Sequence, residues 1–157
     1  MSRPIDWQHS RAFTLTEIAV VLLIAGLMIS MVPPAYFHIA DSMKSDDTVE
    51  QLSDLSDKIT DYYKQHGAWP DSLEDVVSPV PVDPWGHPYQ YLRIAGGSTK
   101  GKGKLRKDKN LVPINSDFDL YSMGPDGQSV PPLTANASRD DIIRGRNGQF
   151  FGVATDY

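Results

Sequence analysis

The residues of this chain best suited to bind an ion are three aspartates in its C-terminal part. Asp126 lies in "SMGPDGQ", and Asp140 and Asp141 lie in "SRDDII". Carboxylates are hard oxygen ligands, and calcium takes about six to eight such oxygens, many of them from loop carbonyls. The spacing is not that of an EF-hand loop. Because aspartate is also common in turns, these residues leave both a calcium-stapled loop and solvated turns open.

The chain offers no grouping of residues for catalysis. It has no cysteine, which excludes disulfides, thiolate chemistry and cysteine metal sites. His38, His66 and His87 are isolated, and no neighbouring Ser/His/Asp signals stand together. The stretch "GKGKLRK" lacks the spacing of a phosphate-binding loop. The net charge of −5 argues against a general nucleic-acid partner. We therefore expect neither an enzyme nor a nucleic-acid binder.

A single carboxylate, Glu17, stands in the otherwise apolar run from Phe13 to Val32. A helix of this length rises roughly 30 Å, enough to cross the hydrocarbon core of a membrane. Basic residues before the run favour a cytoplasmic N-terminus. A charge inside lipid is costly and is usually functional. The residues around the run must therefore explain why Glu17 is there.

Proteolytic cleavage between Ala12 and Phe13 would supply that explanation. The new α-amino group of Phe13 would lie one helical turn from Glu17, close enough to pair with its carboxylate. Cleavage after the run is disfavoured, because "MVPPAYFH" lacks a small-residue cleavage site. An unprocessed signal anchor is the remaining alternative, and it leaves Glu17 unexplained.

The elements that position these residues begin with a long helix. Pro33 and Pro34 predict a kink or a local loosening. Helical periodicity then resumes up to His66, with Gly67 as the residue that ends the helix. The acidic side chains from Asp46 to Asp57 fall on a solvated face. The opposite face carries an apolar stripe that predicts packing on a core: Ile39, Met43, Leu52, Leu55, Ile59 and Tyr62.

The remainder predicts a small α+β unit. After a short helix beginning near Pro70, we expect strands through Tyr89 and Tyr91 and through residues 118–122. The turn "GPDG" closes the second strand, and Phe150, Phe151 and Val153 suit an added edge strand. Trp69 and Trp85 are expected in the core. The basic stretch at 98–109 predicts a surface loop that can dock on an acidic partner, such as the helix of a neighbouring subunit.

Two groups of residues carry a resemblance to a known family. "AFTLTEIAVVLLIAGLMISMVPP" closely resembles the class III signal of type IV pilins and type II secretion pseudopilins. "DPWGHPYQY", "FDLYSMGPDG" and "DDI" resemble the globular domain of the major pseudopilins. The resemblance runs from Phe13 to about Ile142, with gaps. Two departures are Ala12, where family members most often have glycine, and Thr16, which is usually apolar.

The resemblance implies a type IV pilin-like α+β fold with a roughly three-stranded antiparallel sheet. Residues 1–12 would be a leader removed by a prepilin peptidase, with methylation of the new Phe13 amine. Residues 13–34 would form the transmembrane and assembly helix, in which Glu17 and Pro34 act in assembly. Residues 35–66 would be its periplasmic half, and residues 67–157 the globular domain. In that domain, Asp126, Asp140 and Asp141 would hold a calcium ion.

The function that the resemblance implies is structural. The chain would be a subunit of a periplasmic pseudopilus, which drives export of folded proteins across the outer membrane. It would sit in the inner membrane before assembling with itself and other pseudopilins, aided by the prepilin peptidase and the inner-membrane assembly platform. The alternatives are a minor pilin of a type IV pilus or competence system, and a signal-anchored periplasmic enzyme.

Overall fold

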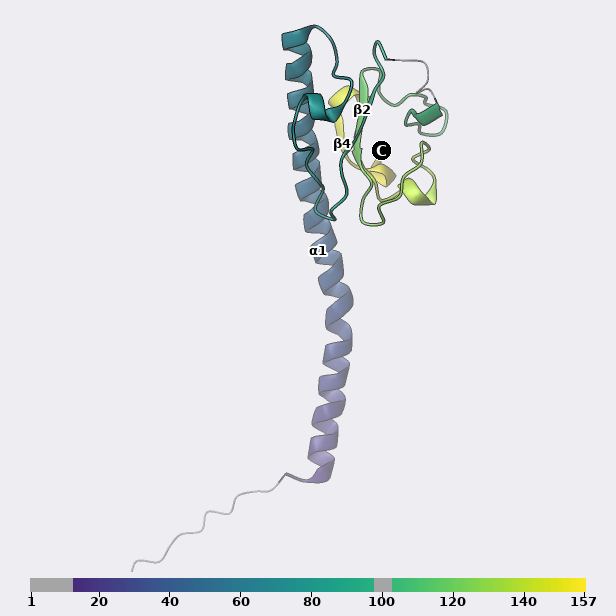
Figure 1. Cartoon of the computed structure of the whole chain (residues 1–157). Helices are drawn as coiled ribbons and strands as arrows, with labels where there is room; N and C mark the ends of the chain where they lie inside the picture. The colour runs from purple at the N-terminus through teal and green to yellow at the C-terminus, as the bar shows by residue number, and fades with distance from the viewer. Residues whose placement is uncertain (1–12, 98–102) are drawn as a thin grey trace, which may run out of the picture. The chain divides into compact units, whose positions relative to one another are not determined.

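A computed structural model describes residues 13–97 and 103–157, with the side chains of residues 31–40 excluded (Figure 1). Contacts divide the chain into two units, one up to Ile39 and one from Ala40 to Tyr157. The predicted leader, with Ala12, lies outside the described residues, and so do residues 98–102 of the predicted basic loop. The side chain of Pro34 also lies outside them. Each unit is considered by itself below.

Helix α1 spans Leu15–His66, a length of 52 residues, and enters both units. Its C-terminal end agrees with the sequence prediction. Gly67 has a φ of +70°, and its backbone N–H donates to the carbonyl of Tyr63 at 2.8 Å. This left-handed residue closes the helix by satisfying one of its last carbonyls. Pro33 and Pro34 fall within this helical span, and the kink or local loosening expected at these two residues stays a prediction.

The sheet has four antiparallel strands in the described part of the chain, in the order β1-β2-β3-β4. Its strands are β1 (Gln90–Arg93), β2 (Phe118–Ser122), β3 (Ile142–Gly145) and β4 (Phe150–Val153). The expected three-stranded sheet is thus corrected to four. The edge strand predicted through Phe150, Phe151 and Val153 is confirmed as β4, and the strand that was not predicted is β3, which pairs with both β2 and β4 and reaches β4 through the tight turn η4 (Arg146–Gly148).

Left-handed backbone makes the turn between β3 and β4 possible. Arg146, Asn147 and Gly148 all have positive φ values, of 51°, 55° and 87°. The Asn147 side-chain oxygen accepts a hydrogen bond from the backbone N–H of Ser116 at 2.8 Å, and the backbone N–H of Asn147 donates to Asn115 Oδ1 at 2.9 Å. Asparagine tolerates this conformation better than most residues. The turn is therefore fixed to a neighbouring loop rather than held by its own backbone alone.

One face of the sheet packs on α1 and forms the main core. The helix contributes Leu52, Leu55 and Ile59, all at most 2% exposed, and the sheet contributes Phe118 and Ile142 among others. Trp69 and Trp85 pack against this core, as predicted. Within the C-terminal unit, Figure 1 shows the last turns of α1 beside the strands. The predicted stripe is wrong at Met43, which is 64% exposed.

The other face of the sheet is covered by loops. Ile142 and Ile143 are consecutive in β3 and both are 1% exposed, so they point to opposite faces. Ile143 joins a second cluster with Ile114, Leu133 and Ala154. The short 3-10 helices η3 (Asn136–Ser138) and η5 (Ala154–Asp156) border this cluster, and η1 (Leu73–Asp75) follows α1. Burial on both faces explains why β3 reads as a continuous buried run.

Candidate functional site

The start of α1 is held by a reciprocal cap. Glu17 Oε2 accepts hydrogen bonds from the backbone N–H of Thr14 at 3.0 Å and from its hydroxyl at 2.9 Å. The Thr14 hydroxyl oxygen in turn accepts the backbone N–H of Glu17 at 3.2 Å. This is a capping box, whose signal is the sequence "TLTE" at residues 14–17. The role predicted for Glu17 from the sequence, a partner for an amine, did not include this cap.

The first half of α1 presents apolar side chains to its surroundings. Phe13 is 79% exposed and Leu15 87%. The other large apolar side chains up to Ile29 are each at least half exposed: Ile18, Val20, Val21, Leu22, Leu23, Ile24, Leu27, Met28 and Ile29. Across the described residues, no helix reaches the combined length and hydropathy required of a membrane-crossing segment. An apolar surface this extensive is typical of a site covered by another molecule or by lipid.

The three predicted calcium ligands do not converge. Asp126 is exposed, and its Oδ1 accepts the backbone N–H of Gln128 at 2.7 Å. Asp140 Oδ2 accepts the backbone N–H of Asp126 at 3.3 Å. Asp141, fully buried, bonds instead to Arg106 and to the Ser129 hydroxyl, the latter at 2.7 Å. Within the residues described, no three His, Cys, Asp or Glu side chains lie close enough to share a metal ion.

The surface position predicted for Arg106 is wrong. Arg106 belongs to the basic stretch expected on the surface, yet it is 2% exposed. Its guanidinium lies over the ring of Tyr121, 4.3 Å from the centroid, and its backbone N–H donates to Asp119 Oδ2 at 2.9 Å. Burial raises the pKa of the Asp119 carboxyl, against the opposing effect of its hydrogen bonds from Arg106 and Asn115. With a buried cation already paired to Asp141, the donor set present does not fit calcium.

A second polar network connects the sequence motifs "DPWGHPYQY" and "FDLYSMGPDG". Asp83 Oδ1 accepts the backbone N–H groups of Trp85 at 3.0 Å and of His87 at 2.8 Å. The hydroxyl of Ser122, at the end of β2, donates to Asp83 Oδ2 at 2.5 Å and accepts the N–H of Gly124 at 3.0 Å. The turn "DPWG" is thereby fixed to the start of "GPDG". Although distant in sequence, the two motifs form one structural unit.

His87 belongs to the same network. Its Nδ1 lies 3.0 Å from the carbonyl oxygen of Gly124, so this nitrogen must carry the proton and donate. Its ring also packs so closely on Gly127 that a Cβ there would lie 2.6 Å from Nε2. Gly127 has a φ of +64°. The isolated histidine of the sequence analysis is thus a half-buried packing residue of the turn.

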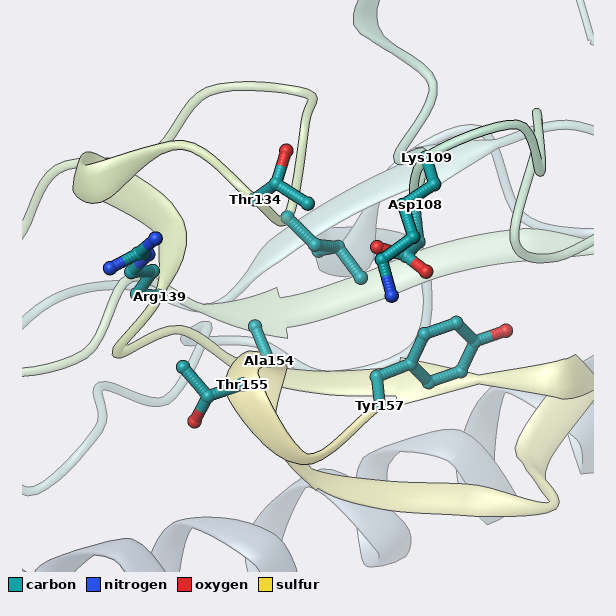
Figure 2. A pocket seen from close by; sticks show the side chains of 8 residues that line it. Asp108, Lys109, Thr134, Arg139, Ala154, Thr155 and Tyr157 are labelled. Carbon is teal, nitrogen blue, oxygen red and sulfur yellow. The ribbon is translucent and has the colours of Figure 1, made fainter.

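A cavity of about 220 Å³ lies near the C-terminal end of the described chain (Figure 2). It is lined by residues of both charges and by apolar atoms: Asp108, Lys109, Leu133, Thr134, Arg139, Ala154, Thr155 and Tyr157. Figure 2 shows Tyr157 and Thr155 on one side and Thr134 on the other. An acidic and two basic side chains share this lining, so its charge favours no single class of ionic ligand.

The geometry and the motifs define a class of protein. A long N-terminal helix with an exposed apolar first part, together with a small antiparallel α+β unit, is consistent with the pilin-like class. The chain belongs to the family of type II secretion system core protein G. It is similar to the core protein G of Pseudomonas aeruginosa, with 30% identity over 142 residues, covering 77% of this chain and 87% of the relative.

Two further relatives agree with this class. The type II secretion system core protein G of Xanthomonas campestris pv. campestris is 27% identical over 147 residues, covering 82% of this chain and 90% of the relative. A type IV major pilin protein of Neisseria gonorrhoeae is 26% identical over 107 residues, covering 64% of this chain and 50% of the relative. No protein-family model matches the chain. No solved structure matches it either.

Proposed function

We propose that this chain is a structural subunit of the periplasmic pseudopilus of a type II secretion system. It polymerises through its N-terminal helix and so drives the export of folded proteins across the outer membrane. Membership of the core protein G family supports this role. The structural observation that carries it is the apolar surface of residues 13–30, which is exposed along its length and interrupted by one acidic side chain, Glu17.

The cap at Thr14 supports the role of Glu17 in assembly. Cleavage between Ala12 and Phe13 creates an amine one residue before Thr14, whose N–H and hydroxyl already hold the Glu17 carboxylate. The negative charge therefore stands at the end of the helix where the positive charge appears. Between helices in lipid, polar pairs and close packing select partners, because no hydrophobic force drives association. Pairing of Glu17 with the amine of a neighbouring subunit sets the axial register of the filament.

The same proposal assigns the remaining segments. Residues 1–12 are a leader that a prepilin peptidase removes, and residues 13–34 anchor the chain in the inner membrane with a cytoplasmic N-terminus. Residues 35–66 continue the helix into the periplasm and carry the globular domain 67–157. Other pseudopilins and the inner-membrane assembly platform are the expected partners. The chain acts as a building element and not as an enzyme.

A second candidate is a minor pilin of a type IV pilus or a competence system. Similarity to the gonococcal type IV major pilin favours it, although the matched region covers only half of that relative. Both candidates would assemble through the N-terminal helix. They differ in the assembly that the subunits form, a secretion pseudopilus or a type IV or competence pilus. Loss of exoprotein secretion on deletion of this chain, with surface pili and DNA uptake intact, distinguishes the pseudopilus from the pilus.

Substitution of Glu17 tests the structural role. The full chain carrying Glu17→Ala replaces the native copy in the host, and exoprotein in the medium is measured beside subunit–subunit cross-linking in the cells. We expect both to be lost while the amount of subunit stays unchanged. Ser45→Ala is the matched control, because Ser45 lies on the same helix outside residues 13–34 and its hydroxyl donates to the Asp41 carbonyl of that helix, at 3.0 Å. Normal secretion by Glu17→Ala would favour a signal-anchored enzyme instead.

A further inference from the structure

We propose that the Arg106 guanidinium is the built-in cation of the loop between β2 and β3, and that it orders this loop without a bound metal. Three oxygens of different kinds surround it. Nη1 donates to Ser129 Oγ at 2.6 Å and to the Val130 carbonyl at 2.8 Å, and Nη2 donates to the carboxylate of Asp141. A carboxylate, a hydroxyl and a backbone carbonyl are the oxygen types that a hard metal ion takes from a loop.

The site connects three stretches that are far apart in the sequence. Arg106 comes from the end of the basic segment, Ser129 and Val130 follow the "GPDG" turn, and Asp141 immediately precedes β3. The Ser129 hydroxyl that accepts from Arg106 also donates to Asp141 at 2.7 Å, which closes the network. A single side chain thus links the interior of the β2–β3 loop, at Ser129 and Val130, to its last residue, Asp141, as a stapling ion would.

The charges explain why an arginine occupies this position. Asp141 is 0% exposed and Asp119 is 1% exposed, and an unpaired buried carboxylate is strongly destabilising. Arg106 lies beside both, bonding Asp141 through its side chain and Asp119 through its backbone. Guanidinium keeps its charge when buried and presents several donors in one plane, which lysine does not. The planar group also stacks on Tyr121, 4.3 Å from the ring centroid.

The two polar atoms left over at this site do not favour a second cation. Arg106 Nε and Asp141 Oδ1 are buried and have no hydrogen-bond partner in the described residues. One is a donor and the other an acceptor, so the site as a whole does not present a set of free oxygens to a second cation. A divalent ion bound to Asp141 would share this carboxylate with the Arg106 guanidinium. The two positive charges would then lie on one buried carboxylate and repel each other strongly. Calcium and Arg106 are therefore alternatives.

Thermal unfolding of the full chain in detergent tests this inference. We expect the same Tm in excess calcium and in excess chelator. Arg106→Met removes the charge at similar volume, and we expect it to lower the Tm by about 10 °C, since it leaves a buried carboxylate unpaired. Arg139→Met is the matched control, because Arg139 is an exposed arginine from the same loop. It should melt like the unmodified chain.

A double variant keeps the test decisive if Arg106→Met folds poorly. Arg106→Met combined with Asp141→Asn removes both charges, and we expect it to melt higher than Arg106→Met alone. Losses that simply add in the double variant would overturn the inference. A rise of several degrees in the Tm of the unmodified chain with calcium would overturn it as well, whatever the variants do, and would restore the calcium site predicted from the sequence.

Discussion

Arg144 and Asp117 form a two-point ion pair, with Nη1 at 2.9 Å from Oδ1 and Nη2 at 2.7 Å from Oδ2. Arg144 is only 3% exposed, and its Nε donates to the hydroxyl of Ser56 on α1 at 2.9 Å. Its guanidinium lies 3.9 Å from the centroid of the Phe118 ring. A charged side chain of β3 therefore crosses the main core and ties the helix to the sheet.

Removal of this side chain should be costly. Arg144→Met leaves Asp117 without its partner at the border of the core, and we expect a loss of about 3 kcal/mol in the free energy of unfolding. Urea denaturation of the full chain, followed by tryptophan fluorescence, measures it. Arg93→Met is the comparison, because Arg93 pairs with Asp71, whose side chain is 89% exposed. An exposed pair contributes about 1 kcal/mol or less, so equal losses in the two variants would contradict the role of Arg144.

The backbone of Gly124 packs closely against that of Asp140, so we expect substitution of Gly124 to cost more stability than substitution of Gly67. Gly124 and Gly67 have similar φ values, +62° and +70°. A Cβ at Gly124 would overlap the carbonyl oxygen of Asp140, whereas one at Gly67 would meet nothing within 4 Å. Gly67→Ala should cost about 1 kcal/mol from its backbone conformation alone. Gly124→Ala should cost at least twice as much in the same denaturation experiment, and similar values would argue against the close approach.

Processing of the N-terminus is predicted at the Ala12–Phe13 bond. Mass spectrometry of the mature chain from cells should find a chain that begins at Phe13 and carries a methyl group on its amine. Ala12→Gly should be processed at least as fast as the unmodified chain, because glycine is the commoner residue before the cut in pilin-like proteins. Ala12→Leu, with a bulky side chain at the same position, should accumulate the unprocessed form. A mature chain that still begins at residue 1 would contradict the proposed leader.

Features determined by neighbours in the chain were predictable. The end of α1 follows from the glycine at position 67, and β2 follows from the alternation of Phe118, Leu120 and Ser122 with the residues between them. The buried helix face was predicted correctly at Leu52, Leu55 and Ile59. The pattern extended too far at Met43, because apolar periodicity shows which residues share a face but not where the packed partner ends.

Features determined by distant residues were not predictable. Arg106 stands among lysines and glycines, a context typical of a surface loop, and only its contact with Asp141, 35 residues later, explains its burial. The same holds for Arg144, which bonds Ser56 across 88 residues. The carboxylates predicted to share calcium were chosen by composition and resemblance. Their actual partners, a backbone N–H for Asp126 and Asp140 and a guanidinium for Asp141, depend on the tertiary fold.

Two variants distinguish the proposed role of Glu17 in assembly from its role as a helix cap. Thr14→Ala removes the capping hydroxyl and should cost about 1 kcal/mol at the helix end, while the carboxylate remains. Glu17→Gln removes the charge and keeps an oxygen that can accept the Thr14 N–H. If Glu17 acts only as a cap, Thr14→Ala should be the more harmful change. If it pairs with the Phe13 amine of a neighbour, Glu17→Gln should be.

The central claim, that the chain polymerises through its charged helix end, is tested most directly by cross-linking between subunits of the full-length chain in the host. The claim predicts that Glu17→Gln abolishes the cross-linked ladder and exoprotein secretion, and that Thr14→Ala retains both. A ladder of normal length in Glu17→Gln, from subunits correctly processed at Phe13, would contradict it.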